Sequence, residues 1–338
     1  MKSRKNILLL IIVFSLLLYS FRDSSIFYFG PSYDDGSLVP GRNQIIIEHD
    51  GLNRTFWVET PSSYSPDQNY PVLFYFHFLG STGGTTTMEN LVNGENIIGV
   101  YPDGINNTWN AGLINSDQGG SFADDYGFTL KILDWMRDNT RINENKLYAF
   151  GMSAGAIFLY EQIASRPNDF AAFALIMGNY FDCESSSYDF QRCVEGRPLI
   201  DYDRGVSILH MHGFMDRSVP YYGGPVGGYA DEKLHFHSVD FAVDLWIDHN
   251  QCTAKPHIDE FLIPGVVIST YGDCNDSSEV KLYVLLNAGH GQFGDHLPQS
   301  TDYGSEISIV WDFFEKHSKN KLLSVSYTHL TLPTSDLV

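Results

Sequence analysis

Short apolar segments alternate along this chain with segments of helical periodicity, and this alternation limits the folds that are open to it. The apolar segments are rich in β-branched and aromatic residues and are bounded by Gly, Pro or Asp, as strands are; they span residues 44–48, 55–59, 72–78, 97–101, 146–150, 172–177, 206–211 and 281–286. The helical patterns span residues 124–138, 154–165, 239–249 and 307–317. This order predicts an α/β domain with a mostly parallel sheet and helices on both of its faces.

The first two strands are separated by the dipeptide Asp50-Gly51, which is typical of a tight hairpin turn. We therefore expect an antiparallel hairpin at the N-terminal edge of the sheet. Residues 43–318 contain no internal repeat and no Pro/Ser-rich linker. The sequence predicts one domain over this range.

The charge balance excludes two classes of partner. The 338 residues include 21 Lys and Arg against 41 Asp and Glu, which gives a formal net charge of −20. A nucleic-acid-binding protein needs a basic surface, and so does a protein that adheres to an anionic membrane. Aromatic residues reach 14% and charged residues only 18%, which argues against long disordered tracts and coiled coils.

Both ends of the chain differ from its centre. Residues 1–5 read MKSRK and residues 7–21 are mostly apolar, so residues 1–22 are expected to be a signal peptide or an N-terminal membrane anchor, followed by a linker at 23–42. Residues 325–334 read VSYTHLTLPT, which looks like the translation of a sequencing-library adapter. We expect residues 325–338 to be a non-native tail on a gene read from a metagenomic fragment.

The strongest chemical signal is the pentapeptide Gly151-Met152-Ser153-Ala154-Gly155. It follows a predicted strand and precedes a helical pattern, which is the context of a nucleophilic serine on a sharp strand-to-helix turn. The small residues let the backbone turn tightly and expose the hydroxyl group. Ser153 is therefore the predicted nucleophile.

A nucleophilic serine needs a base and an orienting acid, which follow in the order acid, then histidine, on this kind of fold. Asp216 lies a few residues beyond the predicted strand at 206–211. His290 lies between glycines in the loop after the last strand, and His296 in the same region is the alternative base. The sequence predicts the triad Ser153, Asp216 and His290.

An oxyanion hole requires backbone N–H groups near the nucleophile. One is expected from Ala154, and the other from the glycine-rich loop after the strand at 72–78. We predict Leu79 as this second donor, with Phe78 as the alternative. Trp109, Tyr101 and Tyr221 are candidate substrate-binding aromatics.

The four cysteines allow three pairings, and nearest-neighbour pairing joins Cys183 to Cys193 and Cys252 to Cys274. No CxxC motif or paired-histidine spacing suggests a metal site, and we expect neither a metal nor another cofactor.

An ordered set of motifs resembles one family. The motifs are His77-x-x-Gly80, Tyr101-Pro-Asp-Gly104, Trp109-Asn-Ala-Gly112, Asp124-Asp125-x-Gly127-Phe128, Gly151-Met-Ser-Ala-Gly155, His212-Gly-x-x-Asp216 and Gly289-His290-Gly291. Over residues 43–317 the chain resembles secreted polyhydroxybutyrate depolymerases and feruloyl esterases, which are α/β-hydrolases allied to acetyl-xylan esterases. The resemblance implies the triad Ser153, Asp216 and His290 and a Cys252–Cys274 disulfide. The chain departs from the family at Phe78, where a glycine is usual, and after His290, where Gly-Gln-Phe replaces a Trp-Pro pair.

The expected function is hydrolysis of carboxylic esters by a secreted serine esterase located outside the cell or in the periplasm. The expected substrates are feruloyl or acetyl esters of plant polysaccharide, or hydroxyalkanoate polyester, and we expect a monomer. A serine peptidase of the same fold is one alternative, although such peptidases carry a large domain ahead of the hydrolase. The other alternative is a non-catalytic binding protein on a hydrolase scaffold.

Overall fold

A computed structural model describes residues 37–111, 123–163, 169–182, 204–228, 235–259, 262–291, 293–298, 303 and 305–319. The expected leader or anchor at residues 1–22, the tail at 325–338 and the Cys183–Cys193 disulfide lie outside these ranges. Within them, no helix is both long enough and apolar enough to cross a bilayer.

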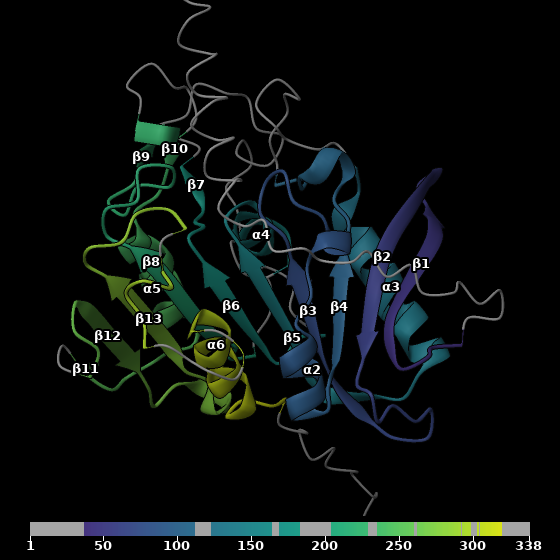
Figure 1. Ribbon diagram of the computed structural model, residues 1–338. Coiled ribbons are helices and arrows are strands. Elements are labelled where there is room, and N and C mark those ends of the chain that lie inside the picture. Colours follow the sequence, from purple (N-terminus) through teal and green to yellow (C-terminus); the bar gives the residue numbers. More distant parts are fainter. Residues whose placement is uncertain are drawn as a thin grey trace, which may run out of the picture. The chain divides into compact units, whose positions relative to one another are not determined.

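One sheet of ten strands forms the centre of the domain (Figure 1). Its spatial order is β1-β2-β4-β3-β5-β6-β8-β13-β12-β11. The strands are β1 (Gly41–His49), β2 (Leu52–Thr60), β3 (Tyr70–Phe76), β4 (Ile98–Pro102), β5 (Ile142–Met152), β6 (Ala172–Ile176), β8 (Ser207–Gly213), β11 (His257–Asp259), β12 (Val266–Tyr271) and β13 (Val280–Leu285).

The sheet is parallel at its centre and antiparallel at both edges. Strands β4, β3, β5, β6, β8 and β13 are parallel to their neighbours in that row. The predicted hairpin is present, because β1 and β2 pair around the Asp50-Gly51 turn. Its first strand begins at Gly41, two residues before the domain boundary expected at residue 43, and Leu38 is also buried in the core.

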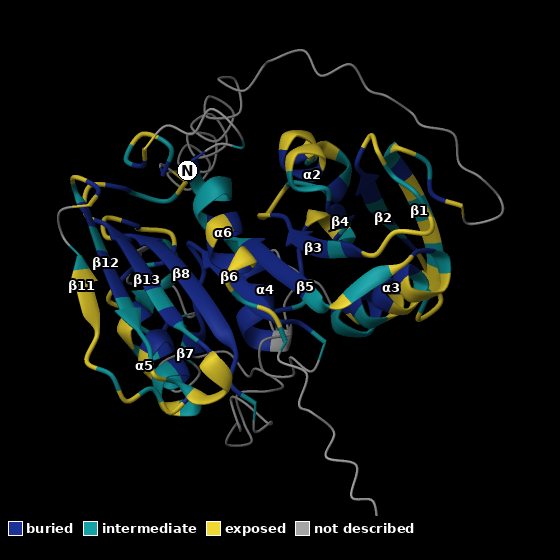
Figure 2. Cartoon of the chain, turned by 90° about the horizontal axis from the view of Figure 1, so that it is seen from below, coloured by how far each residue is buried: buried dark blue, intermediate teal, exposed yellow. Residues whose placement is uncertain are grey.

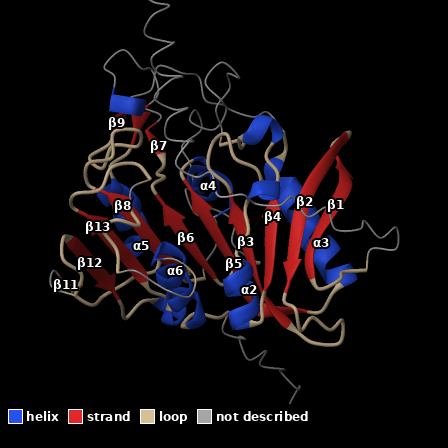
Figure 3. Ribbon diagram, in the orientation of Figure 1, coloured by secondary structure: helices blue, strands red, loops and turns tan. Residues whose placement is uncertain are grey.

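Helices cover both faces of the sheet, as predicted (Figures 2 and 3). Helices α2 (Glu89–Glu95) and α6 (Ser305–Glu315) lie on one face, and α3 (Asp125–Asn139), α4 (Ala154–Phe158) and α5 (Val239–His249) lie on the other. Strand β3 shows why both faces are apolar. Phe74 and Phe76 pack with the α3, α4 and α5 side, whereas Leu73 and Tyr75 pack with the α2 and α6 side. Successive residues of a strand point to opposite faces, so a strand covered on both sides is apolar throughout.

Two features of the sheet were absent from the sequence prediction. The C-terminal edge carries an antiparallel pair, β11 and β12, because β12 pairs with β13 in the opposite direction. A second, three-stranded sheet joins β7 (Phe181–Asp182), β10 (His235–Phe236) and β9 (Gly224–Pro225). The strands of this small sheet are two residues long, too short to show a period in the sequence.

The helix after β5 also differs from its prediction. Residues 154–165 were expected to form one helix, but α4 ends at Phe158 and a π-helical turn follows at Leu159–Ile163. π-helical turns inside α-helices occur frequently at functional sites.

The parallel strands bring their carboxyl ends to one edge of the sheet. Strands β3, β5, β8 and β13 end there at Phe76, Met152, Gly213 and Leu285. The loops that follow these strands are therefore neighbours in space. They carry Ser153, Asp216 and His290 as well as the candidate oxyanion donors Leu79 and Phe78.

Candidate active site

Ser153 occupies a strained turn between β5 and α4. Its backbone has φ 50° and ψ −115°, a conformation that non-glycine residues rarely adopt. The Ser153 N–H donates to Ile176 O at 2.9 Å, and Ile157 N–H donates to Ser153 O at 2.9 Å. Hydrogen bonds to β6 and to the first turn of α4 thus hold the strained residue in place.

The glycines around Ser153 are required by close approach. A Cβ atom on Gly151 would lie 2.6 Å from the backbone of Gly155. A Cβ atom on Gly178, in the loop after β6, would lie 2.6 Å from the Cβ of Ala156. Only glycine fits at these positions without displacing its neighbours. The turn therefore needs the small residues that the sequence motif supplies.

His290 lies at hydrogen-bond distance from Ser153. Its Nε2 atom is 2.9 Å from Ser153 Oγ, and its Nδ1 atom is 2.7 Å from Asp216 Oδ2. A carboxylate only accepts hydrogen bonds, so Nδ1 carries the proton and Nε2 is left to accept from the serine hydroxyl. The alternative base, His296, makes no hydrogen bond to Ser153 among the described residues. The structure therefore brings together the three side chains predicted as the triad.

The carboxylate of Asp216 is buried, with 5% of the residue exposed. Its Oδ1 atom accepts from the N–H groups of Ser218 and Val219 at 2.8 and 2.9 Å. Its Oδ2 atom is thereby left for His290. This division holds the carboxylate in the orientation that a triad requires.

The loop with Asp216 and the loop with His290 are joined by their backbones. Phe214 N–H donates to Leu285 O at 2.9 Å, and Met215 N–H donates to Ala288 O at 3.0 Å. A Cβ atom on Gly213 would lie 2.5 Å from Ala288 O, so the two loops are in direct contact. This contact sets the separation of the acid and the histidine.

Hydrogen bonds to its own carbonyl groups hold the loop after β3 in place. Gly104 N–H donates to His77 Nε2 at 3.1 Å, so His77 Nδ1 carries the proton and donates to Phe78 O at 2.9 Å. Burial lowers the pKa of His77, which is consistent with this neutral ring. Trp109 Nε1–H donates to His77 O at 2.8 Å. The carbonyls of residues 77 and 78 are therefore engaged and cannot turn toward Ser153.

The N–H groups proposed for the oxyanion hole belong to Ala154 and to the loop after β3. No hydrogen bond within the described ranges uses the N–H of Phe78, Leu79 or Ala154. Ala154 is the first residue of α4, where a helix leaves its N–H without an internal partner. These groups are available to a ligand, and Leu79 and Phe78 are both candidates for the second donor.

Two of the three predicted substrate aromatics are core residues and offer a substrate almost no accessible surface. Trp109 is 1% exposed and packs against the rings of both Phe76 and Phe158. Tyr101 is fully buried, and its hydroxyl donates to Glu59 Oε2 at 2.6 Å. Their physical role is to support the loop after β3 and the edge of the sheet.

Tyr221, the third of these aromatics, is 9% exposed. Its ring lies 5.3 Å from the ring of Phe214 and 5.3 Å from the ring of Tyr222. The same edge also carries exposed apolar residues, of which Phe214 and Met215 were given no role in the sequence prediction. These exposed residues come from the loop after β3 and the loop after β8, and they are Phe78, Leu79, Phe214, Met215 and Tyr222.

The sequence prediction gave no role to His210 and His212, two fully buried histidines of β8. The motif His212-Gly-x-x-Asp216 was the available signal, because it places a histidine one turn before the acid.

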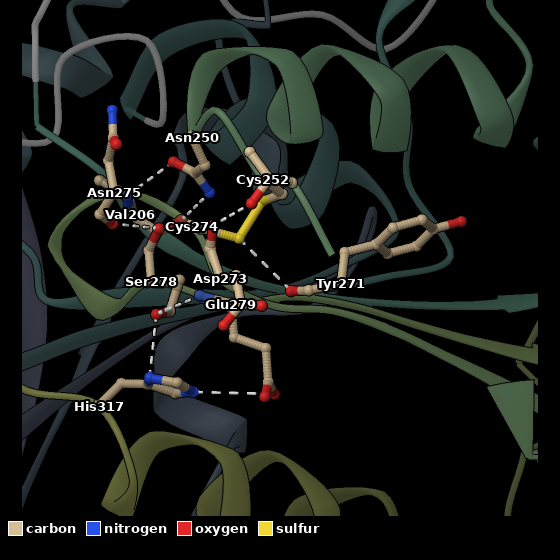
Figure 4. Close-up of a disulfide and its surroundings, with 12 residues drawn as sticks. Val206, Asn250, Cys252, Tyr271, Asp273, Cys274, Asn275, Ser278, Glu279 and His317 are labelled. Carbon is tan, nitrogen blue, oxygen red and sulfur yellow. Dashed lines mark hydrogen bonds and ion pairs between the residues drawn. A yellow bond between two sulfur atoms is a disulfide. The ribbon is translucent and has the colours of Figure 1, made fainter. Parts of the chain in front are cut away.

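The predicted Cys252–Cys274 disulfide is present (Figure 4). It joins the end of α5 to the segment that precedes β13. Next to it, the side chain of Asn250 exchanges two hydrogen bonds with the backbone of Val206, at 2.8 and 2.9 Å. Asn275 N–H donates to Asn250 O at 2.8 Å. The disulfide thus belongs to a junction of α5, β8 and β13, at the end of the sheet opposite to Ser153.

Within the described residues, no group of three or more His, Cys, Asp or Glu side chains is arranged to hold a metal ion.

Comparison with known proteins identifies relatives. No protein-family model matches the chain. The chain is 25% identical over 285 residues to a bifunctional acetylxylan esterase/xylanase of Neocallimastix patriciarum, covering 82% of this chain and 35% of the relative. It is 26% identical over 169 residues to feruloyl esterase D of Neurospora crassa, covering 44% of this chain and 51% of the relative. The chain thus spans about a third to a half of the curated relatives it matches.

A solved structure shows the same fold. An acetyl xylan esterase from Aspergillus awamori superposes with a TM-score of 0.55 and 14% identity, over 81% of this chain and 99% of that one. The sheet order, the turn at Ser153 and the superposition show that the chain has the α/β-hydrolase fold, and its sequence is similar to those of an acetylxylan esterase and a feruloyl esterase.

Proposed function

We propose that the protein is a serine esterase that hydrolyses carboxylic esters with Ser153 as nucleophile, His290 as general base and acid, and Asp216 as the orienting acid. The observation that carries the proposal is the hydrogen-bonded series from Ser153 Oγ through His290 to Asp216 Oδ2, with distances of 2.9 and 2.7 Å. The serine stands on a strained turn, which is the arrangement of a nucleophile in this fold. The names of the two sequence relatives support an ester as the substrate.

The reaction proceeds in two halves. Ser153 Oγ bonds to the carbonyl carbon of the ester while its proton passes to His290 Nε2, and the carbonyl oxygen becomes an oxyanion. The alcohol then leaves with the proton from His290, and an acyl-serine remains. A water molecule repeats both steps and releases the carboxylic acid and free Ser153.

The oxyanion is stabilised by backbone N–H groups, which we assign to Ala154 and Leu79, with Phe78 as the alternative second donor. Loss of one such donor costs about 10²–10³ in kcat in serine hydrolases. Asp216 remains ionised and stabilises the imidazolium that forms on His290.

The substrate is proposed to be an acetyl or feruloyl ester of plant polysaccharide or a hydroxyalkanoate polyester. The exposed apolar side chains Phe78, Leu79, Phe214, Met215 and Tyr222 favour an acyl group or polymer with apolar surface. All three triad residues come from one chain, so we propose that a monomer is active. The Cys252–Cys274 disulfide favours an oxidising location, outside the cell or in the periplasm.

The test is hydrolysis by the purified protein of p-nitrophenyl acetate, methyl ferulate, acetylated xylan and polyhydroxybutyrate, with Ser153→Ala as the control. Turnover of at least one ester by the wild type and loss of turnover in Ser153→Ala are expected. Cleavage of peptide substrates with no ester hydrolysis would identify a peptidase instead. Binding to acetylated xylan without hydrolysis of any substrate would identify a non-catalytic binding protein.

A further inference from the structure

A buried series of three titratable side chains ends beside the acid of the triad. Tyr160 Oη is hydrogen-bonded to His210 Nδ1. His210 Nε2 is 3.0 Å from His212 Nδ1, and His212 Nε2 is 2.8 Å from Val219 O. The three side chains are at most 1% exposed, and none takes part in the proposed reaction.

While both histidines are neutral, each hydrogen bond in this series has one direction. Val219 O can only accept, so His212 Nε2 carries a proton and His212 Nδ1 must accept. His210 Nε2 therefore carries a proton, and His210 Nδ1 accepts from the Tyr160 hydroxyl. The carbonyl group of Val219 thus fixes the tautomer of both neutral histidines, and the hydroxyl of Tyr160 donates the hydrogen bond at the other end of the series.

The series acts on the turn that contains Asp216. Val219, whose carbonyl receives the last hydrogen bond, also donates its N–H to Asp216 Oδ1 at 2.9 Å. Asp216 N–H donates to Gly213 O at 3.0 Å and closes the turn. His212 Nε2 lies 3.6 Å from Asp216 Oδ2, the same oxygen that accepts from His290.

We propose that Tyr160, His210 and His212 are positioning residues that hold His212 as a neutral Nε2–H tautomer and so reserve the Asp216 carboxylate for His290. This inference rests on the proposed esterase function.

A charged His212 would oppose that function. A second cation 3.6 Å from Asp216 Oδ2 would compete with the His290 imidazolium for the same carboxylate. Protonation of His212 at Nδ1 would also require His210 to carry its proton on Nδ1 instead of Nε2, and the Tyr160 hydroxyl to accept instead of donate. The charged form would therefore reverse the order of the whole series.

The surroundings of His210 and His212 also favour the neutral form of both rings. Burial lowers the pKa of His210 and of His212, and the nearby His290 also lowers that of His212, whereas Asp216 raises it. Burial raises the pKa of Tyr160 well above its ordinary value, so its hydroxyl keeps the proton that it donates. The ring of Tyr221, 6.1 Å from that of His212, adds no charge while its hydroxyl stays protonated, and burial raises its pKa.

The order of the hydrogen bonds is measured directly by NMR of protein with 15N-labelled histidine. We expect Nε2–H tautomers for His210 and His212, with no protonation of either ring between pH 5.5 and 8. Spectra of His210→Gln and His212→Gln assign the signals. An Nδ1–H tautomer or an imidazolium at His212 in this range overturns the proposal.

Kinetics test the effect on Asp216. His212→Gln keeps an N–H donor for Val219 O and cannot ionise, whereas His212→Met removes the donor. We expect His212→Met to lower kcat by about tenfold to a hundredfold with KM within about twofold, because a displaced acid impairs the base and not substrate binding. His212→Gln should recover most of kcat. Equal losses in both variants, or a loss confined to KM, overturn the proposal.

Tyr160→Phe tests the start of the series. The variant is expected to release the tautomer of His212, seen as a mixture by NMR, and to lower kcat in the wild-type background but not in the His212→Gln background. Tyr148→Phe is the matched control, because it removes a buried hydroxyl that donates to His317 O at 2.8 Å, away from this series. The same loss of kcat in both tyrosine variants, or in both backgrounds, contradicts the inference.

The NMR result separates this inference from the proposed function. The expected tautomers in a protein that hydrolyses no ester would contradict the esterase function alone. An active esterase with a different tautomer order would contradict this inference alone.

Discussion

A Cβ atom on Gly155 would lie 2.1 Å from the carbonyl oxygen of Phe76. The first turn of α4 therefore passes directly against the end of β3, where the loop with Phe78 and Leu79 begins. The two proposed sources of oxyanion N–H groups, Ala154 and the loop after β3, are brought together by this contact.

Gly155→Ala is expected to lower the stability of the protein and its turnover together. The new methyl group meets backbone atoms, which cannot rotate away, and overpacking of this kind costs about 1–3 kcal/mol. Any shift that relieves the contact moves Ala154 away from the loop after β3. Denaturant unfolding and ester hydrolysis measure the two effects.

The control is Gly272→Ala, since a Cβ atom there meets nothing within 4 Å. It should change neither stability nor turnover. Equal behaviour of the two variants would show that the contact between Gly155 and Phe76 is unimportant.

Asp125 supports the loop after β3 indirectly, through the segment that contains Trp109. Its Oδ1 atom is 2.5 Å from Arg54 Nη2, and its Oδ2 atom accepts from Asn110 N–H at 2.7 Å, next to the Trp109 that holds His77 O. Asp125→Ala would leave the buried Arg54 without its carboxylate, and loss of one partner of a buried ion pair costs about 3–5 kcal/mol. We expect a fall of this size in the free energy of unfolding.

Asp67→Ala is the matched control for Asp125→Ala. Asp67 pairs with Arg141 at 3.5 Å on the surface, where its side chain is 86% exposed. Exposed ion pairs contribute about 0–1 kcal/mol. The interpretation of Asp125 would be wrong if the two variants lost the same stability.

The buried histidines predict a dependence of stability on pH. Burial lowers the pKa of His77, His210 and His212 below the ordinary value of 6.5, so each takes up a proton on unfolding when the pH is below about 6.5. Their contribution to stability is complete above this pH and is lost as the pH falls toward the pKa of the folded state. Wild type should therefore lose more free energy of unfolding than His212→Gln between pH 7.5 and 5.5.

This pH prediction has a control in His257→Gln, which removes an exposed histidine of β11. Its pH dependence should match that of the wild type. A His212→Gln variant with the wild-type slope would mean that folding does not change the protonation of His212 in this pH range, and would contradict the prediction.

The Cys252–Cys274 disulfide is predicted to stabilise the C-terminal edge of the sheet. It spans a sequence separation of 22 residues, and this segment contains β11 and β12. Closing a loop of this size contributes about 3 kcal/mol in the chain-entropy model. The double variant Cys252→Ser/Cys274→Ser should unfold at a lower temperature and hydrolyse esters while it remains folded.

Reductant provides the control for the disulfide. It should lower the unfolding temperature of the wild type by more than that of the double variant, which has already lost this bond. An unchanged unfolding temperature in the double variant would contradict the prediction.

The sequence was most informative where a residue's role depends on local chain geometry. Ser153 was predictable because the turn at residues 151–155 requires small residues, and His290 because it follows a parallel strand whose end lies at the same edge as that of β5. Their catalytic roles, with that of Asp216, stay predictions. The structure adds the distances that join the three side chains.

The sequence was least informative where the environment decides. Tyr101 and Trp109 are aromatic residues near the loops of the site, and the sequence does not tell a ring in a groove from a ring in the core. Strand β11 has three residues, too few to show an alternating pattern. His212 was passed over because it precedes Asp216 in the chain, although folding places its ring beside that carboxylate.

The measurement that tests the central claim most directly is labelling of the protein with a fluorophosphonate, followed by peptide mapping. The proposed triad predicts one modified peptide that contains Ser153, loss of ester hydrolysis in proportion to labelling, and no labelling of a folded Ser153→Ala variant. Labelling at another residue, or undiminished ester hydrolysis by Ser153→Ala, would contradict the assignment of Ser153 as the nucleophile.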